Sequence, residues 1–91
     1  IALRKGVYAV HASRNAQSFV KGIANLGSRP TVSGLETRLE VHLFDFAEQV
    51  YQQHWMIEPV AFIRDEQRFE SFDLLKQQIK LDVEQARGLL H

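Results

Sequence analysis

The hydrophobic period of the chain changes near Ser71, and this change most constrains the fold. Before it, apolar residues occur in short β-branched and aromatic segments. From Ser71 onward they recur every three or four residues, which predicts an amphipathic helix over about 71–90 with Phe72, Leu75, Ile79, Val83, Ala86 and Leu90 on one stripe. Ser71 is suited to cap this helix, and Asp73 suits its first turn. The stripe must cover something, most simply an open end or flank of a sheet.

Four segments before the helix have the composition of strands: GVYAVHA (6–12), SFVKGIAN (18–25), TRLEVHLFDF (37–46) and HWMIEPVAFIR (54–64). We predict a hairpin from the first two, and a loop over LGSRPTVSG (26–34) because it is dense in Gly, Ser and Pro. Pro59 indicates a bulge or an edge position. Strand after strand with short turns predicts an antiparallel sheet or small barrel, with strands within about 6–65.

Length and composition narrow the possible functions. The 91 residues suffice for a single domain, 1–91. Because Lys+Arg and Asp+Glu both number 11, we expect no nucleic-acid or anionic-membrane surface. There is no cysteine, so disulfides and thiolate metal sites are excluded and a reducing, cytoplasmic setting is expected. The sequence shows no apolar run of membrane-spanning length and no signal-peptide pattern.

The stretch LEVHLFDF (39–46) contains the strongest candidate for chemistry. Alternation places Leu39, Val41, Leu43 and Asp45 on one face, mostly a core face, and Glu40, His42, Phe44 and Phe46 on the other. An exposed, half-polar strand face is one explanation. Two rings beside a carboxylate fit a cleft floor better, where Glu40 could act as a general base on a hydroxyl.

Three other features give weaker signals. NLGSRPT could present Asn25, Arg29 and backbone amides to an anion, but it lacks the P-loop pattern, and a plain turn is the better explanation. The four histidines have no metal-binding spacing, so no zinc site is expected. FIRDEQRF (62–69) is either a solvated charged turn or a ligand-binding loop, and the residues leave both open.

Four stretches together resemble, in order and spacing, the C-terminal half of the riboflavin kinase domain of bacterial bifunctional riboflavin kinase/FMN adenylyltransferase (FAD synthase). They are KGVYAV, GIANLGSRPTV, LEVHLFDF and FIRDEQRFESFDLLKQQIKLDVEQAR. The most specific parts are Asn-x-Gly-x-Arg-Pro-Thr followed by Leu-Glu-x-His, and Arg-x-Glu-x-x-Phe before the helix. The resemblance implies a mostly β fold, a small Greek-key antiparallel β-barrel with one C-terminal helix. Because four strands are few for a barrel, we expect its N-terminal strands to lie upstream of this chain.

The resemblance also implies an activity and its residues. The family transfers the γ-phosphoryl group of ATP to the 5′-hydroxyl of riboflavin, giving FMN and ADP with Mg²⁺ or another divalent cation. Glu40 matches its general base. ATP-binding residues map onto Leu43, Asp45 and Tyr51, and flavin-binding residues map onto Arg64, Gln67 and Phe69; no metal ligand maps onto the chain.

One departure limits this expectation. The family's Pro-Thr-Ala-Asn motif, which helps hold metal and phosphates, does not occur in the chain. We therefore expect these 91 residues alone to be inactive, with the motif and an adenylyltransferase domain upstream in the parent protein. The alternative is a non-catalytic flavin-binding or interaction module on the same barrel. An oligonucleotide-binding barrel is disfavoured by the zero net charge.

Overall fold

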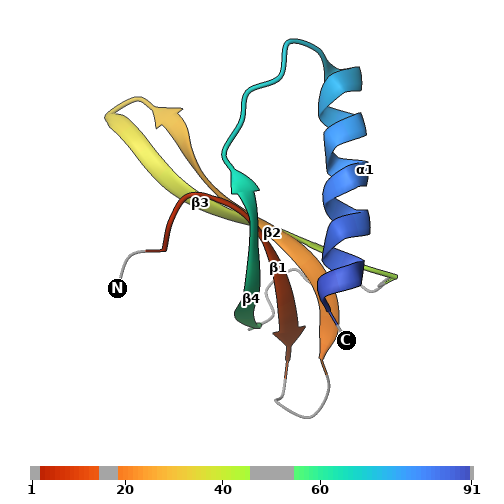
Figure 1. Cartoon of the computed structure of the whole chain (residues 1–91). Coiled ribbons are helices and arrows are strands. Elements are labelled where there is room, and N and C mark those ends of the chain that lie inside the picture. Colours follow the sequence, from red (N-terminus) through yellow and green to blue (C-terminus); the bar gives the residue numbers. More distant parts are fainter. Residues whose placement is uncertain (1–2, 15–18, 46–54, 91) are drawn as a thin grey trace.

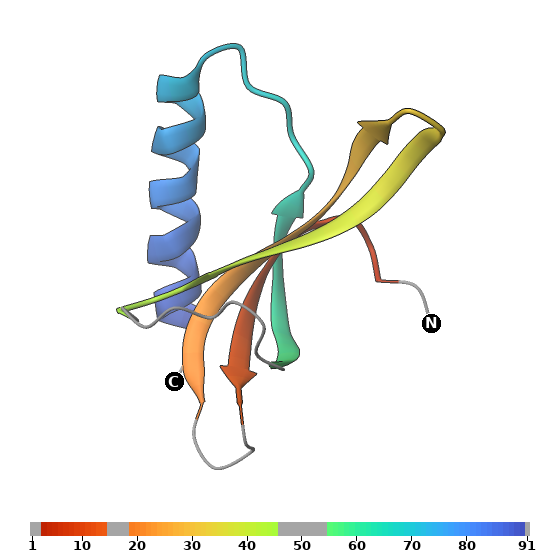
Figure 2. The ribbon, with the colours of Figure 1, turned by 180° about the vertical axis from the view of Figure 1, so that it is seen from behind.

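A computed structural model describes residues 3–14, 19–45 and 55–90. It contains strands β1 (Gly6–Ser13), β2 (Val20–Thr31), β3 (Gly34–Leu43) and β4 (Met56–Asp65), followed by helix α1 (Phe72–Leu89). The strands form one antiparallel sheet in the order β3-β2-β1-β4 (Figure 1). This confirms a mostly β fold with one C-terminal helix. The hairpin of β2 and β3 projects away from the helix, as the view from behind also shows (Figure 2).

Helix α1 begins and ends as its sequence predicts. The Ser71 hydroxyl accepts a hydrogen bond from the Leu74 amide at 3.2 Å, and the Leu90 amide donates to the Ala86 carbonyl at 2.9 Å. Asp73 and Arg87 place charges of the favourable sign in the first and last turns. Among the described residues, no helix has the length and apolar character needed to cross a membrane.

The core lies between α1 and one face of the sheet. Its buried apolar side chains come from both layers: Val7, Ala9, Ile23, Phe44, Ala86 and Leu90. A smaller cluster around Tyr8, Val10 and Ala24 lies on the opposite face of the sheet. The C-terminal part of the helix stripe, with Val83, Ala86 and Leu90, therefore covers a flank of the sheet as predicted, whereas Phe72 and Ile79 of the same stripe remain exposed.

The predicted loop over 26–34 is wrong for most of its length. Strand β2 continues to Thr31 and pairs with β3 from Leu26 opposite Leu39 to Thr31 opposite Gly34, so the turn is confined to residues 32–33. The cross-strand hydrogen bonds outweigh the turn-prone composition. Pro30 is tolerated because β1 stops pairing with β2 at Leu26, which leaves one side of this part of β2 without a described strand.

The two faces of β3 are also the reverse of the expectation. Glu40 and His42 lie opposite Asn25 and Ile23 on the helix-covered face. Leu39 and Val41 point to the other face and are 52% and 37% exposed. Alternation fixes which residues share a face, but the position of the helix decides which face is covered. Phe44, expected in a cleft floor, is instead buried against α1; Phe46 lies outside the described residues.

Pro59 occupies both of the positions predicted for it. It lies on β4, whose described strand neighbour is β1 alone. The register with β1 shifts there, because Ala9 lies opposite Ala61 whereas Val10 lies opposite Pro59. The bulge accommodates a residue that cannot donate a ladder hydrogen bond.

Gly6 is required at the start of β1. Its φ is +149°, and a Cβ there would collide with the Arg64 carbonyl oxygen and the Phe62 ring. Gly6→Ala should therefore lower the free energy of unfolding by about 1–3 kcal/mol. Gly88→Ala is the matched control, since Gly88 lies in α1 with open space around it. This substitution should raise the free energy of unfolding by up to about 1 kcal/mol, as measured by denaturant unfolding. Equal effects of the two substitutions would contradict this account.

Candidate active site

Glu40 lines a hollow of about 280 Å³ between the sheet and α1. The apolar walls come from Val7 and Ile23 on the sheet and from Leu75 and Ile79 on the helix. Asn25, His42, Arg64 and Asp82 supply the polar part of the lining. A carboxylate beside an apolar chamber can orient a hydroxyl group of a ligand whose remainder is bound by apolar contact.

The Glu40 carboxylate has one charged partner among the described residues. Arg29, on β2, donates from Nη2 to Glu40 Oε1 at 2.7 Å, with the two side chains 39% and 54% exposed. Glu40 lines the first hollow, so its contact with Arg29 lies next to the space that a ligand would occupy. Arg29, which the sequence marked as able to contact an anion, thus contacts the carboxylate of Glu40 in this structure.

A second hollow of about 490 Å³ adjoins the first. Asn25 and Leu75 border both hollows. The second is lined by the segment between β4 and α1, which includes Gln67 and Phe69, and by Ser28 and Arg29 of β2. The structure therefore brings four of the predicted residues to one continuous region beside the helix: Glu40, Arg64, Gln67 and Phe69.

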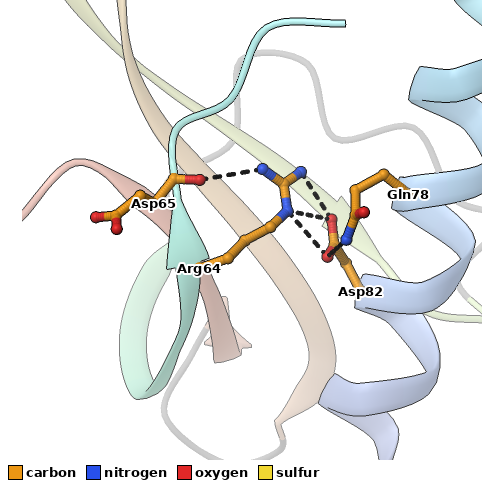
Figure 3. A network of polar contacts seen from close by, with 4 residues as sticks. All are labelled: Arg64, Asp65, Gln78 and Asp82. Carbon is orange, nitrogen blue, oxygen red and sulfur yellow. Dashed lines mark hydrogen bonds and ion pairs between the residues drawn. The ribbon is translucent and has the colours of Figure 1, made fainter.

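Arg64 and Asp82 form a buried ion pair that joins β4 to α1 (Figure 3). Arg64 donates from Nε to both Asp82 carboxylate oxygens at 3.0 Å and from Nη2 at 2.8 Å, and the two side chains are 18% and 2% exposed. Gln78 donates to the same carboxylate at 3.0 Å. Arg64 Nη1 donates to the Asp65 carbonyl, and its guanidinium lies 5.6 Å from the centre of the Phe69 ring.

The segment after β4 has a second anchor on β2. Glu66 accepts a hydrogen bond from the Ser28 amide at 3.0 Å, and a Cβ on Gly27 would collide with the same carboxylate. Gly27, which the sequence marks as part of a possible phosphate loop, instead gives Glu66 room to reach the β2 backbone. FIRDEQRF is therefore tied to the sheet and helix by Arg64 and Glu66.

The predicted ATP-binding residues lie elsewhere. Leu43 lines a different hollow, on the opposite face of the sheet, with Trp55 and Ile57. Asp45 is exposed beside α1, where Arg87 donates to its carboxylate at 3.1 Å. The hydrogen bonds from Arg87, and after them its positive charge, lower the pKa of Asp45. Tyr51 lies outside the described residues.

The sequence pattern predicts α1 as a cover of the sheet, with Leu75 and Ile79 on its core stripe, and does not predict that the helix lines a hollow. Asp82 is the residue of the helix that the prediction lacks. Asp82 follows Ile79 by three positions and Leu75 by seven, so it lies on the apolar stripe. A carboxylate within such a stripe was the available signal that a buried cation would face it.

The described residues contain no group of three or more His, Cys, Asp or Glu side chains able to hold a metal ion. They therefore do not fit a metal centre built by these residues alone.

Comparison with known proteins first identifies the family of the chain. Residues 1–90 match the Flavokinase family, described as riboflavin kinase. The chain belongs to the riboflavin kinase family.

Individual relatives agree with this. The chain is 47% identical over 87 residues to the bifunctional riboflavin kinase/FMN adenylyltransferase of Haemophilus influenzae, covering 96% of the chain and 28% of that protein. It is 45% identical over 82 residues to the RNA-binding riboflavin kinase RibR of Bacillus subtilis, covering 89% and 35%. A solved structure titled as a macrolide-efflux protein from Streptococcus pneumoniae matches with a TM-score of 0.82 and 35% identity, covering 91% and 27%. The chain thus spans about a third or less of the proteins it matches.

The buried ion pair leads to a stability prediction. Asp82→Asn should lower the free energy of unfolding by about 3 kcal/mol, because it leaves the Arg64 charge buried without its counter-ion. Asp65→Asn is the matched control. It removes an exposed pair with Arg4 and should lose less than about 1 kcal/mol in the same denaturant titration. Similar losses of unfolding free energy in both variants would mean that the Arg64–Asp82 pair contributes no more than an exposed ion pair.

Asp45 leads to a prediction of pH dependence. A carboxyl whose folded-state pKa is lowered contributes stability above its ordinary pKa of about 3.9, and this contribution is lost as pH falls through the folded value. Asp45→Asn should therefore show a shallower loss of melting temperature between about pH 5 and pH 3 than the wild type. Asparagine tolerates the Asp45 backbone, whose φ is 54°. Arg87→Gln should make the melting temperature depend less on pH in the same way. A pH dependence equal to that of the wild type in both variants would contradict the pairing of Asp45 with Arg87.

Proposed function

We propose that this chain contributes the base-bearing part of an ATP:riboflavin 5′-phosphotransferase site that makes FMN and ADP. The observation that carries the proposal is the position of Glu40, at the edge of an apolar hollow in a chain of the riboflavin kinase family. Riboflavin combines a flat, largely apolar ring with a polyol, and the two adjoining hollows suit these two parts. Phosphoryl transfer depends mainly on positioning and charge stabilisation, which such a rigid site can supply.

Glu40 acts as the general base. The proton of the 5′-hydroxyl passes to a Glu40 carboxylate oxygen while the hydroxyl oxygen forms a bond to the γ-phosphorus of ATP. The bond between that phosphorus and the bridging oxygen breaks, and ADP leaves. Arg29 holds the carboxylate in place at 2.7 Å. Such a base contributes about 10²–10⁴ in rate.

Gln67 and Phe69 contact the flavin, with Phe69 providing an aromatic wall and Gln67 a hydrogen-bonding amide in the second hollow. Arg64 borders the first hollow with its guanidinium fixed by Asp82, so it presents an oriented cationic edge to the ring. On the nucleotide side we assign Leu43, Asp45 and Tyr51 to ATP. The described contacts do not bring the nucleotide residues next to the base, because Leu43 and Glu40 lie on opposite faces of the sheet.

Further elements of the proposal come from the family. They are a divalent cation such as Mg²⁺ carried by the ATP phosphates, closure of the sheet into a Greek-key barrel by additional strands, and an adenylyltransferase domain in the parent protein. A cytoplasmic location follows from the same assignment. The described residues provide no metal-binding cluster. No step of the phosphoryl transfer is therefore assigned to the cation, to the additional strands or to the adenylyltransferase domain.

Glu40→Gln in the full-length protein tests the function. It should lower FMN formation from riboflavin and ATP by about 10²–10⁴-fold, because the amide cannot accept the proton, and should leave riboflavin affinity largely intact. Product is measured by chromatography and affinity by flavin fluorescence. Glu36→Gln is the matched control on the same strand, where Glu36 is exposed and 3.8 Å from Arg38, and it should retain activity. Wild-type turnover by Glu40→Gln would rule out the base role; retained flavin binding without any turnover by the wild type would favour a non-catalytic flavin module.

A further inference from the structure

Asn25 occupies the junction of the two hollows. It lies on β2 directly opposite Glu40 on β3 and Val7 on β1, on the helix-covered face of the sheet. It borders the first hollow beside Glu40 and the second beside Phe69. A ligand that extends from Glu40 toward Phe69 must therefore pass Asn25.

The side-chain oxygen of Asn25 is buried and accepts no hydrogen bond from any described residue. Buried amide oxygens are nearly always hydrogen-bonded, because removal from water is unfavourable unless a donor replaces it. None of the donor-bearing residues that line the two hollows donates to this oxygen. Arg29 donates to Glu40, Arg64 to Asp82, and the Ser28 amide to Glu66. An acceptor without a partner at the junction of two hollows is suited to a hydrogen-bond donor carried by a bound ligand.

We infer that Asn25 is a specificity-determining residue that accepts a hydrogen bond from a secondary hydroxyl of the substrate's polyol chain. The inference rests on the proposed function, which places the terminal hydroxyl at Glu40. Cross-strand neighbours on one face have Cβ atoms about 4.5–5.5 Å apart, so a hydroxyl one or two carbons from the reacting one comes within reach of Asn25. An amide suits an alcohol because it offers an acceptor and donors, whereas an ionised carboxylate only accepts.

The test compares two flavins on the full-length protein. One is riboflavin; the other carries an unbranched 5-hydroxypentyl side chain, which keeps the ring and terminal hydroxyl and lacks the secondary hydroxyls. Dissociation constants are measured by flavin fluorescence for the wild type and for Asn25→Leu. The wild type should prefer riboflavin by about tenfold or more, and Asn25→Leu should lose most of this preference by binding riboflavin more weakly while binding the analogue as before.

Two controls separate this role from a structural one. Gln77→Leu makes the same amide-to-leucine change on the exposed part of α1 and should keep the full preference. Without ligand, Asn25→Leu should melt at or above the wild-type temperature, because it removes a buried acceptor that has no described partner. Asn25→Val serves as a second variant if the leucine does not fold.

The outcomes are distinct. If the wild type prefers riboflavin and the Asn25 variants keep that preference, Asn25 does not read the polyol and the proposed function stands. If the variants melt well below the wild type with the preference unchanged, Asn25 is structural and the inference is wrong. If the wild type binds neither flavin, both the inference and the proposed function fail.

Discussion

The buried ion pair between Arg64 and Asp82 fixes helix α1 to strand β4, and the candidate site depends on that attachment. Apolar contacts between a helix and a sheet tolerate sliding and rotation, whereas three hydrogen bonds from one guanidinium to one carboxylate do not. The pair sets where Leu75 and Ile79 face the sheet, and so defines the hollow beside Glu40. It also holds the start of the segment that carries Gln67 and Phe69.

The sheet and the segment after β4 contribute different groups to the site. Strands β2 and β3 hold Asn25, Arg29 and Glu40 in a fixed register, so the polar groups sit on a rigid sheet. The segment after β4 brings the aromatic and amide groups, tied to β2 by Glu66 and to the helix through Arg64. This arrangement suits a reaction in which the protein mainly orients one hydroxyl and supplies a base.

Much of the fold followed from local patterns. The helix stripe, its Ser71 cap and the Pro59 bulge each depend on chemistry within a few residues, and each was predicted correctly. The loop over 26–34 was not, because pairing with β3 across the hairpin overrode the local preference of Gly, Ser and Pro. Of the residues predicted for the site, Glu40, Arg64, Gln67 and Phe69 lie in one region, while Leu43 and Asp45 lie apart from it. The lining that the helix provides did not follow from the sequence pattern, because it depends on how the helix packs.

The sequence by itself determined the order of elements and the family, because these depend on residue types and their spacing along the chain. The tertiary structure decided which face of β3 is covered, that Arg64 is engaged by Asp82, and that Asn25 keeps a buried oxygen without a described donor. Those facts depend on how an 18-residue helix packs against the sheet. The local pattern marks Asp82 as a carboxylate on an apolar stripe, but it does not identify Arg64 as the partner.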